Sequence, residues 1–304
     1  MLHDVIVVGG GFAGLSAAMQ LARARRRVLV VDAGLPRNRF AEASHGFLGQ
    51  DGKAPLDILR QAACQVAAYP TVEIVRGEAL EARRDVNDDF VVEISGGRTA
   101  KARRLVLAIG VADTLPDVPG LKERWGATVL HCPYCHGYEV RDRPLGVLAN
   151  HPMAAHQAAM IPDWGPTTLF TQDRFEPDAE QLAHLAARGV TIERRPVVEL
   201  LGDAPALEAV RLSDGRVVTI NALFVAPATR MASSLAQQLG CVFDDGLLGP
   251  LIRTDDWKAT SIPGVFAAGD AARAMHNATL ASADGVMAGV GAHQSLIRDV
   301  ELAA

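Results

Sequence analysis

A glycine turn between a strand and a helix sets the strongest limit on the fold of this chain. Gly9, Gly11 and Gly14 form a G-x-G-x-x-G pattern directly after the apolar run Asp4–Val8, and a helix pattern follows over Ala13–Ala24. The first glycine permits a tight turn, the second lets the backbone approach a pyrophosphate, and the third lets the helix pack on the strand. The pattern therefore predicts a strand–turn–helix unit that binds phosphate groups.

The residues around this turn complete a dinucleotide site. Phe12 and Ala13 open the helix, whose free N–H groups and dipole favour an anion at its N-terminus. A second apolar strand, Val28–Val31, ends at Asp32, where a carboxylate can accept hydrogen bonds from a ribose hydroxyl. Strand, helix and acid together predict a βαβ unit that binds a dinucleotide.

The rest of the chain repeats this architecture weakly. Alternating apolar and polar residues over 72–109, with two turn signals, predict a β-meander that closes on the buried strand Leu105–Gly110. A second βαβ pattern and three further elements are expected over 145–149, 153–160, 168–171, 179–188, 222–226 and 264–297. The expected fold is α/β, with two Rossmann-like nucleotide-binding domains of the three-layer ββα type.

Composition excludes several classes of function. A chain of 304 residues can form two domains, and its formal net charge of −5 gives no reason to expect nucleic-acid binding. No apolar run approaches the roughly 20 residues that span a bilayer, and no signal peptide is expected at an N-terminus that contains Asp4. We therefore expect a cytoplasmic protein that does not insert into membranes.

The second informative motif is a dithiol flanked by two histidines, within His131–Glu139. Cys132 and Cys135 have the C-x-x-C spacing of a thiol–disulfide exchange site, in which both sulfurs meet at the start of a helix. Three other readings compete with it: a c-type haem attachment site, a zinc site and a structural cysteine pair. Haem attachment belongs to exported proteins, and the chain has no second C-x-x-C to complete a zinc site. We therefore predict a redox dithiol and no metal.

The C-terminal part contains the sequence Gly264-Val-Phe-Ala-Ala-Gly269-Asp270. This segment resembles the second FAD motif of the pyridine-nucleotide-disulfide oxidoreductase superfamily, and the resemblance implies that the aspartate binds the ribityl and pyrophosphate region of FAD. Ala108-Ile109-Gly110 resembles another strand end of that superfamily. By the same resemblance, further contacts with FAD are expected from Ala79, Ala278, Thr279, Arg39 and His45.

The whole arrangement is similar to the low-molecular-weight thioredoxin reductases. Their order implies an FAD domain in two halves, 1–113 and 242–304, around a central domain, 114–241, that carries the dithiol. It also implies a homodimer, with Cys135 next to the flavin and Cys132 exchanging with substrate. The reductases have an aspartate after the second cysteine, where this chain has His136, so we expect His136 to transfer protons. His131 is a second candidate for that role.

The residues that form the nicotinamide-binding site of the reductases are replaced in this chain. Their second glycine turn is replaced by Asn150-His151-Pro152, in which Pro152 has no N–H for a phosphate and the other two side chains would crowd it. The basic residues expected after the next strand are replaced by Thr171-Gln172-Asp173-Arg174. Binding of NAD(P)H is therefore doubtful.

A flavoenzyme that has a dithiol but no nicotinamide-binding site must obtain its electrons from another source. The motif Cys132-x-x-Cys-His-Gly-Tyr-Glu139 resembles the dithiol oxidases that close the disulfides of gliotoxin, holomycin and romidepsin. That resemblance implies oxidation of a small-molecule dithiol, with electrons passing through the cysteines and FAD to dioxygen. The alternatives are an NAD(P)H-dependent disulfide reductase, a reductase fed by another donor such as ferredoxin, and a non-enzymatic flavoprotein redox sensor.

Overall fold

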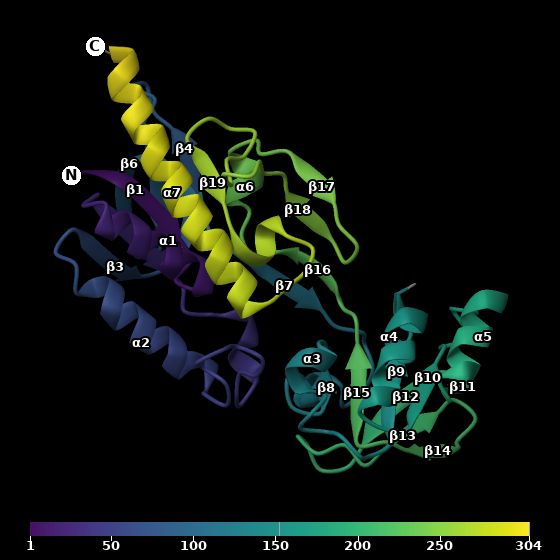
Figure 1. The fold of residues 1–304 in the computed structure, drawn as a ribbon. Coiled ribbons are helices and arrows are strands. Elements are labelled where there is room, and N and C mark those ends of the chain that lie inside the picture. Colours follow the sequence, from purple (N-terminus) through teal and green to yellow (C-terminus); the bar gives the residue numbers. More distant parts are fainter. Residues whose placement is uncertain (152, 304) are drawn as a thin grey trace. The chain divides into compact units, whose positions relative to one another are not determined.

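The computed structural model describes residues 1–151 and 153–303, with side chains as far as residue 298, and it divides into two compact units (Figure 1). Unit 1 comprises Met1–Arg39, Leu56–Ala112 and Thr229–Ala304. Unit 2 comprises Phe40–Pro55 and Asp113–Ala228. The fold is α/β, as the sequence predicts. The chain passes from one unit to the other along β7 (Val111–Thr114) and again along β16 (Ala228–Met231), and these two strands are hydrogen-bonded to each other.

Unit 1 is built on a seven-stranded sheet with the order β3-β2-β1-β6-β5-β4, in which β19 also pairs with β6. Strands β3, β2, β1, β6 and β19 run parallel, whereas β4, β5 and the first half of β6 form an antiparallel meander. The elements of this unit are β1 (Leu2–Val8), α1 (Phe12–Arg23), β2 (Val28–Asp32), α2 (Pro55–Ala67), β3 (Val72–Arg76), β4 (Ala79–Arg84), β5 (Phe90–Ile94), β6 (Arg98–Leu107), α6 (Leu235–Gln238), β17 (Phe243–Asp245), β18 (Pro250–Ile252), β19 (Val265–Ala267) and α7 (Ala278–Ala303).

Alternation along β1 divides the core of unit 1 into two layers. Val5 and Val7 face an apolar cluster that includes residues of α1 and α7, while Ile6 and Val8 face a second cluster formed with the meander. All four side chains are at most 6% exposed. A strand buried on both faces explains why this segment reads as a continuous apolar run.

Helices α1 and α7 cross at small residues, and Figure 1 shows them side by side over the sheet. A Cβ on Gly285 would lie 2.0 Å from the backbone oxygen of Ala13, and one on Gly289 would lie 2.7 Å from that of Ala17. Glycine at both positions therefore permits the close approach. Among the described helices, including the 26-residue α7, none is long and apolar enough to cross a membrane.

A buried ion cluster ties α7 to the loops beside it. Asp284 is 6% exposed, and its two carboxylate oxygens lie 2.8 Å from Nζ of Lys258 and 3.0 Å from a guanidinium nitrogen of Arg273. Because both cations lie within hydrogen-bond distance, the carboxylate is compensated on both oxygens.

Unit 2 has three layers. A parallel sheet with the order β11-β10-β9-β15-β8 has α4 and α5 against one face and the antiparallel sheet β12-β13-β14 against the other. Phe224 of β15 faces the helical layer, while Leu223 and Val225 face the antiparallel sheet. The elements are β8 (Val129–Leu130), α3 (Pro133–His136), β9 (Leu145–Leu148), α4 (Ala154–Met160), β10 (Thr167–Phe170), α5 (Ala179–Ala187), β11 (Thr191–Glu193), β12 (Val197–Leu201), β13 (Ala209–Leu212), β14 (Val217–Thr219) and β15 (Ala222–Val225).

Two expectations about organisation differ from the structure. The predicted meander over 72–109 is wrong for its first strand, because β3 pairs in parallel with β2. The compact units divide the chain at 112/113, one residue from the expected boundary at 113, but at 228/229 instead of 241, and they place residues 40–55 in unit 2. Residues 229–241 belong to unit 1, since Leu235, Ala236 and Cys241 are buried in its core with residues of β4 and β5.

Candidate active site

The glycine turn of unit 1 has the geometry of a phosphate cradle. Gly9 has a φ of +104°, and a Cβ there would lie 2.2 Å from the backbone oxygen of Ala108. A Cβ on Gly14 would lie 1.8 Å from the oxygen of Gly9, whereas one on Gly11 would meet nothing within 4 Å. Gly9 and Gly14 are therefore required by the protein's own packing, and Gly11 leaves open space over the turn.

The helix that follows this turn keeps its N-terminus available to an anion. Gly11 is the N-cap of α1, makes no side-chain capping bond, and the first turn, which begins at Phe12, contains no acidic residue. No acidic side chain of the first turn therefore offsets the dipole of α1. The residues present at this turn fit a bound dinucleotide.

Asp32 lies beside the turn at the end of β2. Its Oδ1 accepts hydrogen bonds from the backbone N–H groups of Gly10 (3.1 Å) and Gly34 (3.0 Å), and its Oδ2 lies 3.4 Å from a guanidinium nitrogen of Arg76. These bonds fix the carboxylate at the edge where the parallel strands end. A ribose hydroxyl could share the second oxygen with Arg76, which belongs to no sequence motif of a dinucleotide site.

The second predicted FAD motif meets the first at Ala13. Gly269 has a φ of +76°, and a Cβ on it would lie 2.9 Å from that of Ala13. Ala108 and Gly269 follow β6 and β19, which are paired in parallel, so both lie at the carboxyl edge of the sheet with Gly9. Asp270 forms an ion pair with Arg37 at 3.1 Å. The structure thus brings together residues that are more than 250 positions apart in the sequence.

The remaining residues of unit 1 that are predicted to contact the flavin lie in the core or at the ends of strands and helices. Ala79 is buried at the start of β4 in the apolar core, and Gly110 follows β6 with a φ of +65°. Ala278 and Thr279 begin α7, where the side-chain oxygen of Asn277 accepts the N–H of Thr279 at 2.8 Å. That N–H is therefore already bonded within the protein.

The two loop residues expected near the flavin belong to different compact units. The guanidinium of Arg39 donates to the backbone oxygens of Pro36 (3.0 Å) and Leu35 (3.5 Å) in its own turn. His45 belongs to unit 2, where it lies against residues that follow the dithiol. Arg37, two residues before Arg39, makes the contact with the second FAD motif instead. Sequence spacing alone gives no means of choosing between these two arginines.

The dithiol lies at the start of the short helix α3 in unit 2. Cys132 and Cys135 form a disulfide with a Cα–Cα distance of 5.3 Å. Cys132 is the N-cap and Pro133 is the first helical residue, where its missing N–H costs nothing. The backbone oxygen of His131 accepts a hydrogen bond from the buried side chain of Gln157 on α4 (3.1 Å), which anchors the segment.

A cluster of titratable side chains includes His136, which directly follows the second cysteine. The rings of His136 and His45 meet edge to face, with 6.3 Å between their centroids. His45 lies 3.6 Å from a carboxylate oxygen of Glu139 and 3.7 Å from one of Asp51. Burial lowers the pKa of His136, and proximity to His45 lowers it further, whereas the carboxylate of Glu139 opposes both effects. His136 is thus held neutral near pH 7, as a proton acceptor requires.

The region equivalent to a nicotinamide-binding turn is occupied by the chain's own side chains. Nδ1 of His151 accepts the backbone N–H of Met153 (3.2 Å), just before α4. The side-chain amide of Asn150 donates to the backbone oxygen of Ala226 (2.8 Å). Pro152, whose missing N–H supported the same expectation, lies outside the described residues.

Two basic residues near the next strand are also engaged. Arg194 binds Glu176 through two hydrogen bonds, at 2.7 and 3.1 Å, and Arg195 lies 4.0 Å from Asp173. Each acid competes with any phosphate for its arginine. Arg194 and Arg195 are thus paired with acids of the chain itself, whereas Arg174, which lies soon after β10, is exposed.

Comparisons with known proteins agree with this geometry. Thioredoxin reductase tcpT of Claviceps purpurea is 32% identical over 98% of this chain and 95% of its own, and thioredoxin reductase sirT of Leptosphaeria maculans is 30% identical over 95% and 93%. An oxidoreductase structure from Agrobacterium tumefaciens is 50% identical, with a TM-score of 0.93 over 98% of this chain and 99% of that one. The structure of HlmI is 38% identical, with a TM-score of 0.92 over 99% and 95%.

The profile of one family spans nearly the whole chain. It matches residues 3–285, which include the glycine turn, the dithiol and the second FAD motif. The relatives that match over the full length bear the name of thioredoxin reductases. The chain therefore belongs to the pyridine nucleotide-disulphide oxidoreductase family and is a thioredoxin reductase-like oxidoreductase.

Proposed function

We propose that this oxidoreductase uses FAD to oxidise a small-molecule dithiol to a disulfide, with dioxygen as the terminal electron acceptor. The observation that carries the proposal is the bond from the N–H of Met153 to Nδ1 of His151. In a nicotinamide-dependent enzyme, the N–H groups at this helix start would bind the pyrophosphate. Here a side chain takes that place, while the dithiol is intact.

FAD would be held by the turn at Gly9–Gly14, by Asp32 and by the Gly269–Asp270 segment. The open space over Gly11 and the uncapped start of α1 support this assignment. Bound FAD would accept two electrons from the reduced dithiol and pass them to dioxygen, which yields hydrogen peroxide. The resemblance to thioredoxin reductases also supports a homodimer.

The protein's own residues would then perform a thiol–disulfide exchange. A substrate thiolate attacks Sγ of Cys132, the Cys132–Cys135 bond breaks, and Cys135 leaves as a thiolate. The second substrate thiol attacks the mixed disulfide, which forms the product disulfide and releases Cys132. The substrate loses two electrons and two protons, and the enzyme dithiol gains the electrons.

Neutral His136 is suited to accept those protons. A thiol with a pKa near 8.5 is mostly protonated at pH 7, so attack needs a base beside the disulfide. The lowered pKa of His136 keeps its ring unprotonated there. His45 and Glu139 adjoin it and provide a route for the proton toward solvent, since both the Glu139 and Asp51 side chains are exposed.

The alternative is an NAD(P)H-dependent disulfide reductase, which the family allows. An anaerobic titration of the flavin absorbance distinguishes the two. We expect dithiothreitol to bleach the flavin, air to restore it with formation of hydrogen peroxide, and NADPH and NADH to have no effect. A Cys132→Ser variant is the matched control, because it keeps the flavin site but cannot exchange with a dithiol. Rapid bleaching by NADPH would instead establish the reductase.

A further inference from the structure

Arg37 joins two loops of unit 1 that the sequence separates by more than 230 residues. One guanidinium nitrogen lies 3.1 Å from Oδ2 of Asp270 and 2.6 Å from Nδ1 of His276. Arg37 begins a short 3-10 turn after β2, Asp270 follows β19, and His276 precedes α7. The side chains of the ion pair are only 18% and 19% exposed.

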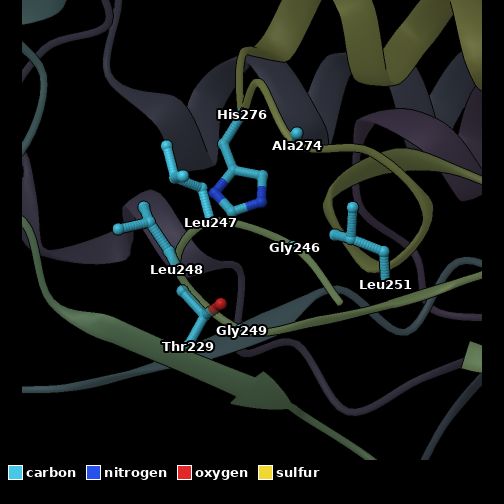
Figure 2. Close-up of a pocket in the computed structure, with 8 residues that line it drawn as sticks. All are labelled: Thr229, Gly246, Leu247, Leu248, Gly249, Leu251, Ala274 and His276. Atoms are coloured by element: carbon cyan, nitrogen blue, oxygen red, sulfur yellow. The ribbon is translucent and has the colours of Figure 1, made fainter. Parts of the chain in front are cut away.

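The contact with His276 fixes the state of that ring. An arginine guanidinium only donates hydrogen bonds, so Nδ1 of His276 must be the acceptor, and the ring is the neutral tautomer protonated at Nε2. Figure 2 shows that the same ring lines a small cavity with Thr229 and the loop Gly246–Gly249. His276 is therefore held between Arg37 and this loop.

The position of the ion pair suggests that Arg37 offsets the negative charge of Asp270 near a bound pyrophosphate. Gly269 packs against Ala13 at the start of α1, so Asp270 lies at the edge where a pyrophosphate would meet that helix. A carboxylate beside two phosphate charges is unfavourable, because like charges repel strongly where solvent is partly excluded. A cation that neutralises the carboxylate removes that repulsion.

We propose that Arg37 is a positioning residue for cofactor retention, which neutralises Asp270 and ties the loop after β2 to the loop before α7. The inference rests on FAD binding as given under the proposed function. It assigns to Arg37 a role that the sequence motifs of the FAD site do not include. It also distinguishes Arg37 from Arg39, whose guanidinium contacts the carbonyls of its own turn.

The test measures FAD affinity separately from catalysis. Flavin-free protein is titrated with FAD by fluorescence, and its melting temperature is recorded without FAD. We expect Arg37→Ala to raise the Kd for FAD by about 10-fold, the scale of the coupling between residues of one salt-bridge network. Arg37→Lys should recover part of the affinity, and Arg253→Ala, which removes an exposed pair with Asp244, should match wild type.

A second substitution separates charge neutralisation from general structure. In the Arg37→Ala background, Asp270→Asn should lower the Kd again, because the amide oxygen still offers FAD a hydrogen-bond acceptor while no carboxylate remains to repel the phosphates. An unchanged Kd in Arg37→Ala, or a loss of FAD that only follows a lower melting temperature of the flavin-free protein, would overturn the inference. A wild-type protein that binds no FAD would refute the proposed function itself, which is a different result.

Discussion

Alanine substitutions at Gly9 and Gly11 should have different effects, one on stability and the other on FAD binding. At Gly9, φ is +104°, a region that alanine occupies at a cost of about 1–3 kcal/mol. The added Cβ would also lie 2.2 Å from the backbone oxygen of Ala108, and overpacking of this kind costs about 1–3 kcal/mol. Gly9→Ala should therefore destabilise unit 1 by about 4 kcal/mol, the middle of the combined range.

At Gly11 the protein itself offers no obstacle. Its φ of −80° and ψ of −169° suit alanine, and a Cβ would meet no atom within 4 Å. The expected cost is about 1 kcal/mol or less, from the poorer N-cap. The methyl group would nevertheless point into the space assigned to the pyrophosphate. Gly11→Ala should therefore fold normally and lose FAD.

Thermal unfolding of flavin-free protein, together with the flavin content after desalting, separates the two effects. In a unit of this size, about 1 kcal/mol shifts Tm by about 2–4 °C, so Gly9→Ala should melt about 8–16 °C below wild type and Gly11→Ala within about 4 °C of it. A Gly11→Ala protein that retains stoichiometric FAD would refute the assignment of the cradle. A Gly9→Ala protein with the wild-type Tm would refute the packing argument.

Three further changes test the dithiol and the core. Cys135→Ser should form a stable mixed disulfide on Cys132 with an oxidised substrate, detectable by mass, whereas Cys132→Ser should form none. Glu139→Gln should move the acidic limb of the kcat/KM profile to lower pH: the carboxylate raises the pKa of His136, so without it the ring is protonated only at lower pH. Asp284→Asn should cost about 3 kcal/mol and lower Tm by about 6–12 °C, because two cations lose their partner; an unchanged Tm would contradict this.

Local sequence patterns made the first βαβ unit and the disulfide predictable. The glycine motif, its strand and its helix lie within one βαβ unit, and the disulfide of Cys132 and Cys135 depends on a spacing of three. Strand β3 was assigned to the wrong pairing because an alternating strand has the same pattern beside a parallel or an antiparallel partner. Its partner β2 is set by the crossover helix α2, and no local signal reports that choice.

Long-range side-chain contacts were beyond reach for a different reason. The position of His45 beside His136 depends on the segment 40–55 packing with residues more than 80 positions later. The resemblance to a flavin-contacting loop gave no indication of that packing. Arg37 and Arg39 differ only in which one the 3-10 turn directs toward Asp270. Such choices depend on the angle of a turn, which composition and spacing do not encode.

Two features of unit 2 favour the same direction of electron flow. A reductase must bind a hydride donor, and the N–H of Met153 that would help to bind its phosphates is bonded to His151. An oxidase must remove two protons from each substrate dithiol, and a half-buried, neutral His136 accepts protons near pH 7 more readily than a carboxylate of ordinary pKa. Each change alone would be compatible with either direction. On the proposed oxidase function the two features act together: one occupies an N–H that a hydride donor would need, and the other accepts the protons of the substrate.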